Sequence, residues 1–216
     1  MHGDAQRPTQ ILRLVHIDNL PVLLRRGGLH APNHVPNDGL AYRTIHNVEI
    51  QRERHARQIP CGPGGTLHDY VPFYFGPHSP MLLQLKTGQV EGYDEGQEPL
   101  LYLATTAQTV AESGVGYVFS DGHGIKKITG WFDDLGQLDK VDWDVARAKQ
   151  WNDTLDDPDR KRRKQAEFLV HRFCAWGLLQ GIGVIDEPTA ARVAGILDEI
   201  ATTPRPVVKV KRGWYY

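Results

Sequence analysis

Three polar side chains stand where the expected strands and helices would hold them in fixed positions. His16 ends a predicted strand just before a predicted helix, Arg54 lies on a short polar helix, and Glu167 opens an apolar strand. A helix start suits an anion or a carboxamide, and a guanidinium suits a phosphate. Each residue also has an ordinary structural explanation, as a hydrogen-bonding histidine, a surface arginine or a solvated carboxylate. Spacing does not decide between these readings, because no local motif links the three.

A run of five consecutive cations is the second candidate feature. Residues 160–164 read RKRRK and follow Asp156, Asp157 and Asp159. Such a run can meet a phosphate backbone although the whole chain has a formal net charge of -1. A solvated charged turn or helix face explains the same pattern equally well.

The composition is that of a folded protein and favours one domain over residues 1–216. Of the 216 residues, 40% are hydrophobic and 24% charged, which excludes a disordered chain. No apolar run approaches the roughly 20 residues that span a bilayer, and the first ten residues hold no signal-peptide core. Cys61 and Cys174 have neither disulfide-framework nor metal-ligand spacing. We therefore expect a cytoplasmic protein without a metal site or a membrane partner.

Strands dominate the predicted elements, and the predicted helices are short. Strands are expected over 11–17, in two pieces within 69–85, and over 99–105, 116–120, 166–173 and 205–216. Helices are expected over 19–26, 47–57, 108–114, 141–151 and 188–201. The sequence has no βαβ rhythm and no GxGxxG motif, which argues against a Rossmann dinucleotide site. The predicted class is α+β, in one domain.

Seven segments, in order, resemble the DarT family of DNA ADP-ribosyltransferase toxins. They are RLVHIDNLPVLLRRGGL, EIQRER, LHDYVPFYFGPHSPML, GQEPLLYL, FDDLGQLDKVDWD, KQAEFLVH and RGWYY, and they cover nearly the whole chain. The resemblance implies the ADP-ribosyltransferase split β-sandwich, with NAD in a cleft between two sheets. The strand-rich pattern is compatible with that fold but does not by itself require it.

The resemblance also implies roles for individual residues. Glu167 matches the catalytic glutamate and Arg54 the active-site arginine, with Arg52 as the nearest competitor on the same helix. The positions that match NAD contacts are His16, Ile17, Asp18, Gly27, Asn33 and Arg54.

Residues 121–166 correspond to the family's substrate-recognition loop region. Six basic positions in it are candidates for contacts with DNA: His123, Lys126, Lys127, Arg160, Arg162 and Arg163. His78 is a further candidate, because it stands where the family pattern has an arginine after the FYF segment. We expect this histidine to make DNA binding weaker or more dependent on pH. Tyr117, Trp131 and Phe132 could stack on bases or belong to the core.

The implied activity is transfer of ADP-ribose from NAD to a thymine of single-stranded DNA in short sequence contexts, with release of nicotinamide. Cleavage of the nicotinamide–ribose bond generates an oxocarbenium-like centre that a carboxylate stabilises. Arginine stays protonated, so an electrostatic role suits it better than that of a base. A DarG-type macrodomain antitoxin is the implied partner, and no metal is required.

Other functions remain open from the sequence. They are a guanosine-modifying enzyme, a transferase acting on RNA or protein, and a non-catalytic module that binds NAD or nucleic acid. A nuclease toxin is disfavoured, because the ten histidines form no recognisable metal cluster or acid–base pair in the sequence.

Overall fold

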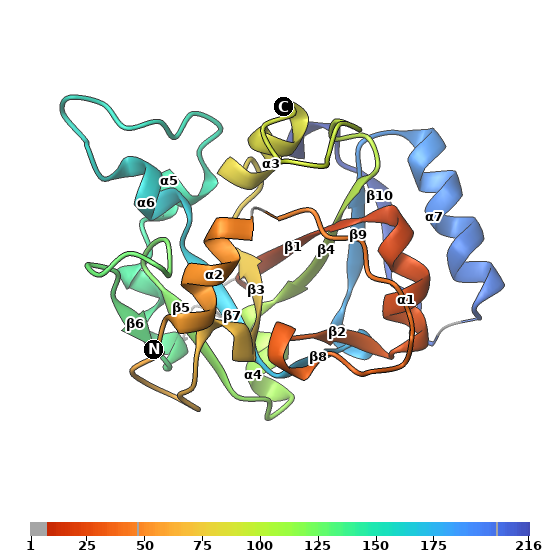
Figure 1. Cartoon of the computed structure of the whole chain (residues 1–216), viewed down its shortest axis with the longest axis horizontal. Coiled ribbons are helices and arrows are strands. Elements are labelled where there is room, and N and C mark those ends of the chain that lie inside the picture. The colour runs from red at the N-terminus through yellow and green to blue at the C-terminus, as the bar shows by residue number, and fades with distance from the viewer. Residues whose placement is uncertain (1–7, 47, 202) are drawn as a thin grey trace, which may run out of the picture.

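The computed structural model describes residues 8–46, 48–201 and 203–216. Its framework is a mixed sheet of eight strands in the order β10-β9-β4-β1-β3-β7-β5-β6 (Figure 1). In chain order these strands are β1 (Gln10–His16), β3 (Tyr70–Tyr74), β4 (Leu100–Thr106), β5 (Tyr117–Ser120), β6 (Trp131–Phe132), β7 (Glu167–His171), β9 (Gly181–Val184) and β10 (Val207–Val210). A second, two-stranded sheet pairs β2 (Gly28–His30) with β8 (Phe173–Ala175).

The large sheet is nearly divided between β1 and β3. Strand β1 pairs with β4 along its whole length, and β3 pairs with β7 from Tyr70 to Tyr74. Between β1 and β3 the only registered pair in the described chain is Leu12 with Tyr74. Two half-sheets, β10-β9-β4-β1 and β3-β7-β5-β6, therefore meet at a narrow junction.

The helices are short and lie around this framework (Figure 1). They are α1 (Leu20–Arg25), α2 (Val48–Ala56), α3 (Pro80–Lys86), α4 (Ala107–Glu112), α5 (Trp143–Arg147), α6 (Arg160–Lys164) and α7 (Glu187–Glu199). Local capping fixes several starts: the Ser79 side chain accepts from the Leu82 N–H at α3, and the Asp186 side chain accepts from the Thr189 N–H at α7.

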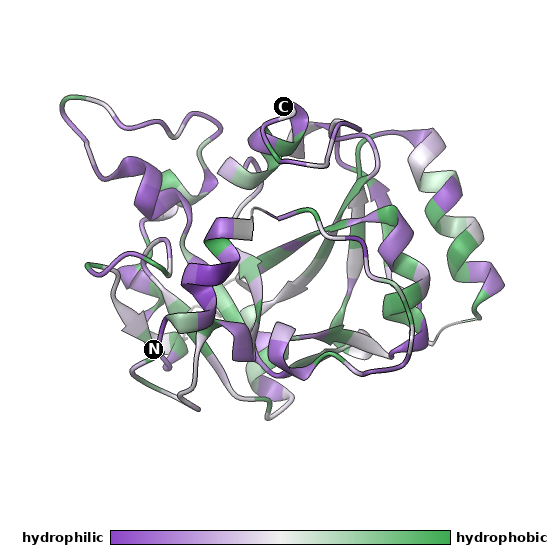
Figure 2. Cartoon of the chain, in the orientation of Figure 1, coloured by the Kyte–Doolittle hydropathy of each residue, from purple (hydrophilic) through white to green (hydrophobic). Residues whose placement is uncertain are grey.

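Alternate residues of β1 bury their side chains in two different apolar clusters. Ile11 and Val15 belong to the larger cluster, whereas Leu12 and Leu14 belong to a second one. This period of two is that of a strand covered on both faces. Figure 2 shows apolar residues along the central strands and polar residues over α2 and α6.

The predicted α+β class is confirmed, and several element boundaries are corrected. Residues 80–86 form helix α3 and not a strand, because Ser79 caps the first turn and Pro80 suits its first position. The helix expected over 141–151 covers only 143–147. The strand expected over 166–173 is broken at Arg172, whose φ of 61° ends β7 before β8 begins in the other sheet. The strand expected over 205–216 covers only 207–210. Asn47, the first residue of the helix expected over 47–57, lies outside the described residues.

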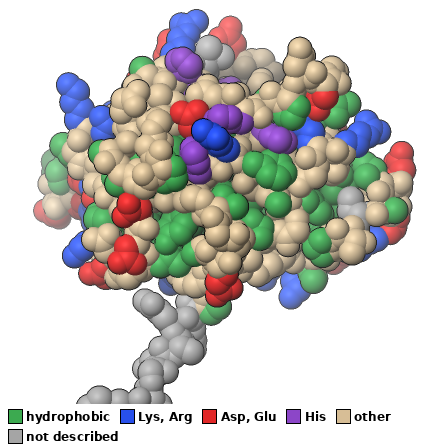
Figure 3. Space-filling view, turned by 90° about the horizontal axis from the view of Figure 1, so that it is seen from below, with side chains coloured by type: hydrophobic (Ala, Val, Ile, Leu, Met, Phe, Trp, Pro, Cys, Tyr) green, Lys and Arg blue, Asp and Glu red, His purple; other side chains and the backbone are tan. Residues whose placement is uncertain are grey.

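The surface has no strong separation of charge on the face seen from below. Histidine side chains gather near the middle of this face, and acidic and basic side chains are scattered around them (Figure 3). Within the described ranges, no helix has both the length and the apolar character needed to cross a bilayer.

Candidate active site

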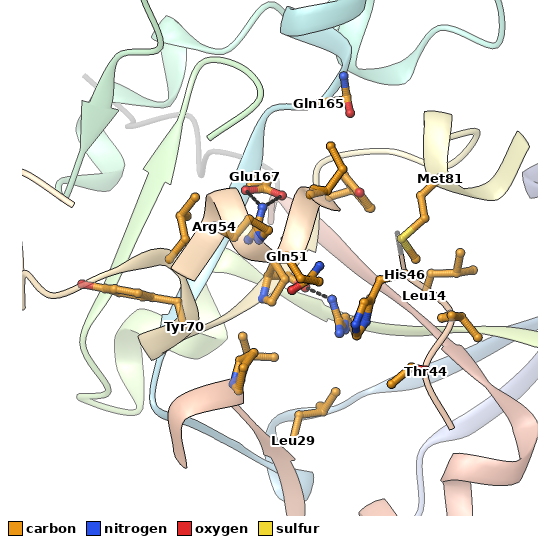
Figure 4. Close-up of a pocket in the computed structure, with 18 of the residues that line it drawn as sticks. Leu14, Leu29, Thr44, His46, Gln51, Arg54, Tyr70, Met81, Gln165 and Glu167 are labelled. Atoms are coloured by element: carbon orange, nitrogen blue, oxygen red, sulfur yellow. Dashed lines mark hydrogen bonds and ion pairs between the residues drawn. The ribbon is translucent and has the colours of Figure 1, made fainter. Parts of the chain in front are cut away.

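A cavity of about 570 Å³ opens at the junction of the two half-sheets. Arg13 and Leu14 of β1, Tyr74 of β3 and Glu167 of β7 line it from the sheet side. Helix α2 contributes Gln51 and Arg54, and α3 contributes Met81 (Figure 4). The volume is within the range of about 300–1,000 Å³ that small-molecule sites usually have.

Arg54 and Glu167 form a buried ion pair in the wall of this cavity. Nη1 of Arg54 donates to both carboxylate oxygens, at 2.9 Å to Oε1 and 3.0 Å to Oε2 (Figure 4). The arginine is 6% exposed and the glutamate 3%. Nη2 of Arg54 is buried and has no hydrogen-bond partner in the described chain, so it is a donor available to a ligand.

The fold brings this pair together from positions 113 residues apart. Glu167 is the first residue of β7, and its backbone N–H donates to the Ser120 hydroxyl at 3.2 Å. Arg52, the competing arginine on α2, is exposed. The geometry therefore pairs Glu167 with Arg54 and leaves Arg52 on the surface.

The loop between β5 and β6 passes directly beside the carboxylate. A Cβ added to Gly124 would lie 3.2 Å from Oε2 of Glu167, so the absence of a side chain permits this approach. Arg57 anchors the loop by donating to the carbonyls of Gly124 at 3.2 Å and Lys126 at 3.3 Å. On the other side, the His123 N–H donates to the Arg162 carbonyl at 2.9 Å.

His123 is held in its neutral form beside the ion pair. Burial lowers the pKa of His123 to about 4; the Glu167 carboxylate opposes this shift and neighbouring cations reinforce it. Its Nδ1 is buried and has no partner among the described residues. A neutral imidazole offers one donor and one acceptor, so it can bind a polar ligand without adding charge.

Tyr74 also remains neutral at the cavity wall. Burial raises the pKa of Tyr74 to about 12, and the Glu167 carboxylate adds to the shift. The residues that surround Glu167 therefore combine a permanent cation with uncharged polar groups.

A family model described as "ssDNA thymidine ADP-ribosyltransferase, DarT" matches residues 12–216. The chain belongs to the DarT family. It is 41% identical over 209 residues to a DNA ADP-ribosyl transferase of Thermus sp. (strain 2.9), which covers 97% of both chains. It is 35% identical over 206 residues to one from Escherichia coli O127:H6, with 95% of this chain and 93% of that one covered.

Solved structures agree with this assignment. Thermus sp. 2.9 DarT in complex with ADP-ribosylated ssDNA superposes with a TM-score of 0.91 at 39% identity, over 100% of both chains. The same protein in complex with NAD+ gives 0.88 at 39% identity, over 98% and 99%. Thermosipho africanus DarTG in complex with ADP-ribose gives 0.73 at 18% identity, over 96% of this chain and 51% of that one, and so supports the fold alone. The expected DarT fold is confirmed.

Of the six positions predicted to contact NAD, Arg54 lines the cavity and the other five do not. His16 is buried: its Nδ1 accepts from the Asp18 N–H at 3.1 Å, and its Nε2 faces Glu95 at 3.5 Å. Burial lowers the pKa of His16. Ile17 is fully buried, and Asp18 pairs with Arg43 at 3.1 Å.

At two further positions predicted to contact NAD, Gly27 and Asn33, neighbouring residues line the cavity instead. Gly27 is exposed and ends α1 with a φ of 70°, whereas Gly28 lines the cavity. Asn33 donates to Asp69 at 3.0 Å, and His30 and Pro32 line the cavity near it.

Of the predicted DNA contacts, His123 and Lys126 line the cavity and Lys127 is exposed next to them. The three arginines of the basic run lie outside the lining and are engaged by aspartates. Arg162 pairs with Asp121 at 2.8 Å and Asp159 at 2.7 Å, Arg163 pairs with Asp142 and Asp157, and Arg160 lies 3.7 Å from Asp157.

The prediction for His78 is corrected. Its side chain is 5% exposed, and its Nε2 lies 3.2 Å from the Tyr215 carbonyl. A histidine enclosed in this way does not meet a DNA phosphate. All three candidate aromatics pack against apolar clusters: Phe132 stacks on Phe119, Tyr117 stacks on Phe168, and Trp131 packs against a third cluster.

Sequence reasoning missed several lining residues, including Arg13, Tyr74, Met81 and Gln165. The strand period offered a partial signal, because Tyr70, Pro72 and Tyr74 alternate along β3 and line the cavity, although Val71 between them lines it too. The others depend on how distant elements meet. Among the described residues, no group of three or more His, Cys, Asp or Glu side chains could hold a metal ion.

Proposed function

We propose that this DarT-family protein transfers ADP-ribose from NAD to a thymine base of single-stranded DNA and releases nicotinamide, with Glu167 and Arg54 at the reacting centre. The observation that carries the proposal is the ion pair of Arg54 and Glu167, which is buried from solvent and lines a cavity large enough for a small-molecule ligand. Solved structures of a relative in complex with NAD+ and with ADP-ribosylated ssDNA support it.

Glu167 stabilises the positive charge that develops on the ribose as its bond to nicotinamide breaks. Each carboxylate oxygen has two acceptor positions, and Arg54 uses one on each oxygen. The remaining positions can accept a ribose hydroxyl while the pair stays intact. Fixed negative charge beside the ribose stabilises this transition state more than the ground state, because positive charge moves from the nicotinamide ring onto the ribose as the bond breaks.

Arg54 acts on the attacking base through its charge. Its unpartnered Nη2 can donate to a carbonyl oxygen of the base or to a phosphate oxygen. A cation bound there makes the neighbouring ring N–H more acidic, which favours attack by the ring nitrogen on the ribose carbon. Nicotinamide leaves as a neutral molecule, and the proton of the ring N–H passes to solvent water. Arginine itself stays protonated and takes no proton.

His123 completes the wall on the side of the loop. An imidazole whose pKa is lowered to about 4 is a weak base, so we assign it a hydrogen bond to the base and not proton removal. Single-stranded DNA suits this arrangement, because its bases can enter a cavity without the unstacking cost of a duplex.

The remaining assignments rest on family membership. We propose that NAD binds without a metal near β2, with contacts from Gly28 and His30 beside the predicted positions His16, Ile17, Asp18, Gly27 and Asn33. The cytoplasm contains both NAD and single-stranded DNA, and we propose it as the compartment. We also propose that the protein is a toxin restrained by a DarG-type macrodomain partner.

The test uses NAD and a panel of single-stranded oligonucleotides that each lack one base, with products weighed by mass spectrometry. We expect an added ADP-ribose that disappears only when thymine is absent. Arg54→Gln should abolish the addition, whereas the matched change Arg52→Gln on the same helix should keep it. Addition that requires guanine would replace the proposed acceptor, and NAD binding without any DNA product would replace the proposed activity.

A further inference from the structure

Four of the five cations in residues 160–164 are already used by the fold. The three arginines pair with aspartates. Lys164 is 3% exposed, and its ammonium donates to the carbonyls of Pro77 at 2.8 Å, Ala146 at 2.9 Å and Ala148 at 2.7 Å. These four side chains anchor α6 and are not free to meet a ligand.

Lys161 differs from its neighbours. Its side chain is exposed, lines the cavity and has no ion pair with any residue that the structure describes. Gln165 lies four residues later, one turn along the chain, and also lines the cavity. The backbone N–H of Lys161 donates to Asp153 at 2.7 Å, which helps to fix this end of α6.

Lys126 is a second free cation at the same cavity. It is exposed and lies on the loop between β5 and β6; within the described ranges it too has no carboxylate partner. Lys126, Lys161 and His123 line the same cavity, and the positive charges of the two lysines help to lower the pKa of His123. Figure 1 shows α6 and this loop on the same side of α2, and the hydrogen bond from the His123 N–H to the Arg162 carbonyl joins them.

We propose that Lys161, together with Lys126, binds the phosphates on either side of the nucleotide whose base enters the cavity. This inference rests on the proposed transfer to single-stranded DNA. A lysine is a flexible point charge that can follow an irregular backbone, and the two lysines come from different elements. A strand held at both points presents one base to His123, Arg54 and Glu167.

The same chemistry could serve another phosphate source, the diphosphate of NAD. DNA is favoured because both lysines are exposed on segments at the rim, as a strand running outside the cavity requires. Gly28, Leu29 and Pro32, by contrast, line the part of the cavity that we assign to NAD.

The experiment compares Lys161→Gln and Lys126→Gln with Lys149→Gln, a matched loss of charge at an exposed lysine that does not line the cavity. Three quantities are measured: the KM of transfer for a thymine-containing oligonucleotide, the KM for NAD, and the affinity for the labelled oligonucleotide across a salt series. We expect each cavity variant to raise the DNA KM about 5- to 10-fold and to reduce the log–log salt slope by about 0.7, which is one phosphate contact on a single strand. Lys149→Gln should behave like the wild type, Lys161→Arg should restore the salt slope that Lys161→Gln loses, and the KM for NAD should not change.

The possible failures are distinguishable. Equal effects of Lys161→Gln and Lys149→Gln would show only a general loss of positive charge and would overturn the inference. A rise in the KM for NAD with the DNA KM unchanged would assign the lysines to the NAD diphosphate and would also overturn it. Absence of any DNA product from the wild-type protein would overturn the proposed function, and the binding series would still decide the role of Lys161.

Discussion

Replacing Arg54 by Met and Glu167 by Leu, singly and together, separates the contribution of the ion pair to stability from its contribution to catalysis. Both side chains are at least nine-tenths buried and make two N–O contacts of 2.9 and 3.0 Å. Either single change leaves the other charge buried without its counter-charge. The double change leaves two apolar side chains facing each other.

The expected magnitudes follow from this burial. Breaking a buried pair costs about 3–5 kcal/mol, whereas replacing both partners by apolar residues is often close to neutral. Because the pair faces an open cavity, water can partly solvate a charge left alone, so we take about 2 kcal/mol for each single change and about 1 kcal/mol for the double change. The coupling energy is then about 3 kcal/mol, at the upper end of measured pairs. All three variants should lose at least about 100-fold in transfer rate, because each lacks a charge at the reacting centre.

Urea unfolding followed by tryptophan fluorescence measures stability, and release of nicotinamide in the presence of DNA measures activity. The reasoning is refuted if the double variant loses the sum of the single effects, because the two side chains would then not interact in the folded protein. Arg52→Met is the control, since this exposed neighbour should change stability by no more than about 0.5 kcal/mol.

Three further predictions concern the surroundings of the pair. Gly124→Ala places a methyl group 3.2 Å from Oε2 of Glu167, so transfer should fall about tenfold, whereas Gly195→Ala, with nothing within 4 Å, should keep full transfer in the same assay. Lys164→Met leaves three carbonyls without their donor and should lower the free energy of unfolding by about 3 kcal/mol in urea; a loss below about 1 kcal/mol would contradict the anchoring role. The pKa of His123 is about 4 when folded and 6.5 when unfolded, so the unfolded chain binds more protons between these values. Stability should therefore fall as the pH drops from 6.5 to 4, and His123→Gln should make this fall shallower in unfolding curves at pH 7, 5.5 and 4.5; an unchanged slope would argue against burial of the neutral imidazole.

Local patterns predicted the central strands well and failed where a tertiary contact decides. The apolar content of β1 and β4 identified both strands, because their side chains are buried along almost their whole length. The segment PMLLQLK has the same apolar character but forms α3, since a single cap at Ser79 outweighs it. The break at Arg172 has no clear local signal; its φ of 61° is set by the Arg172 N–H donating to the Asp69 carbonyl and the Arg172 carbonyl accepting from Ala31.

The sequence predicted which residue types form the site but not which of them contact one another. Family resemblance, and not spacing, identified Arg54 and Glu167, and the fold supplies the contact between them. The basic run shows why sequence alone was insufficient. Arg162 and Arg163 pair with the nearby Asp159 and Asp157, but they are also engaged by Asp121 and Asp142, which lie 41 and 21 residues away and which no local pattern indicates.

Within the described residues, β1 and β3 share one registered pair and a hydrogen bond from the Arg13 side chain to the Pro72 carbonyl, and this sparse pairing has a mechanical consequence. Few interstrand bonds resist rotation of one half-sheet against the other, so the junction is the compliant line of the molecule. A ligand that lies across this junction contacts Arg13 on one half-sheet and Tyr74 on the other, and therefore links the two half-sheets. Ligand binding therefore raises the free energy of unfolding by RT ln(1 + [L]/Kd), where [L] is the concentration of free ligand. The backbone amides flanking Leu12 and Tyr74 are where this stabilisation should appear, as slower exchange with solvent.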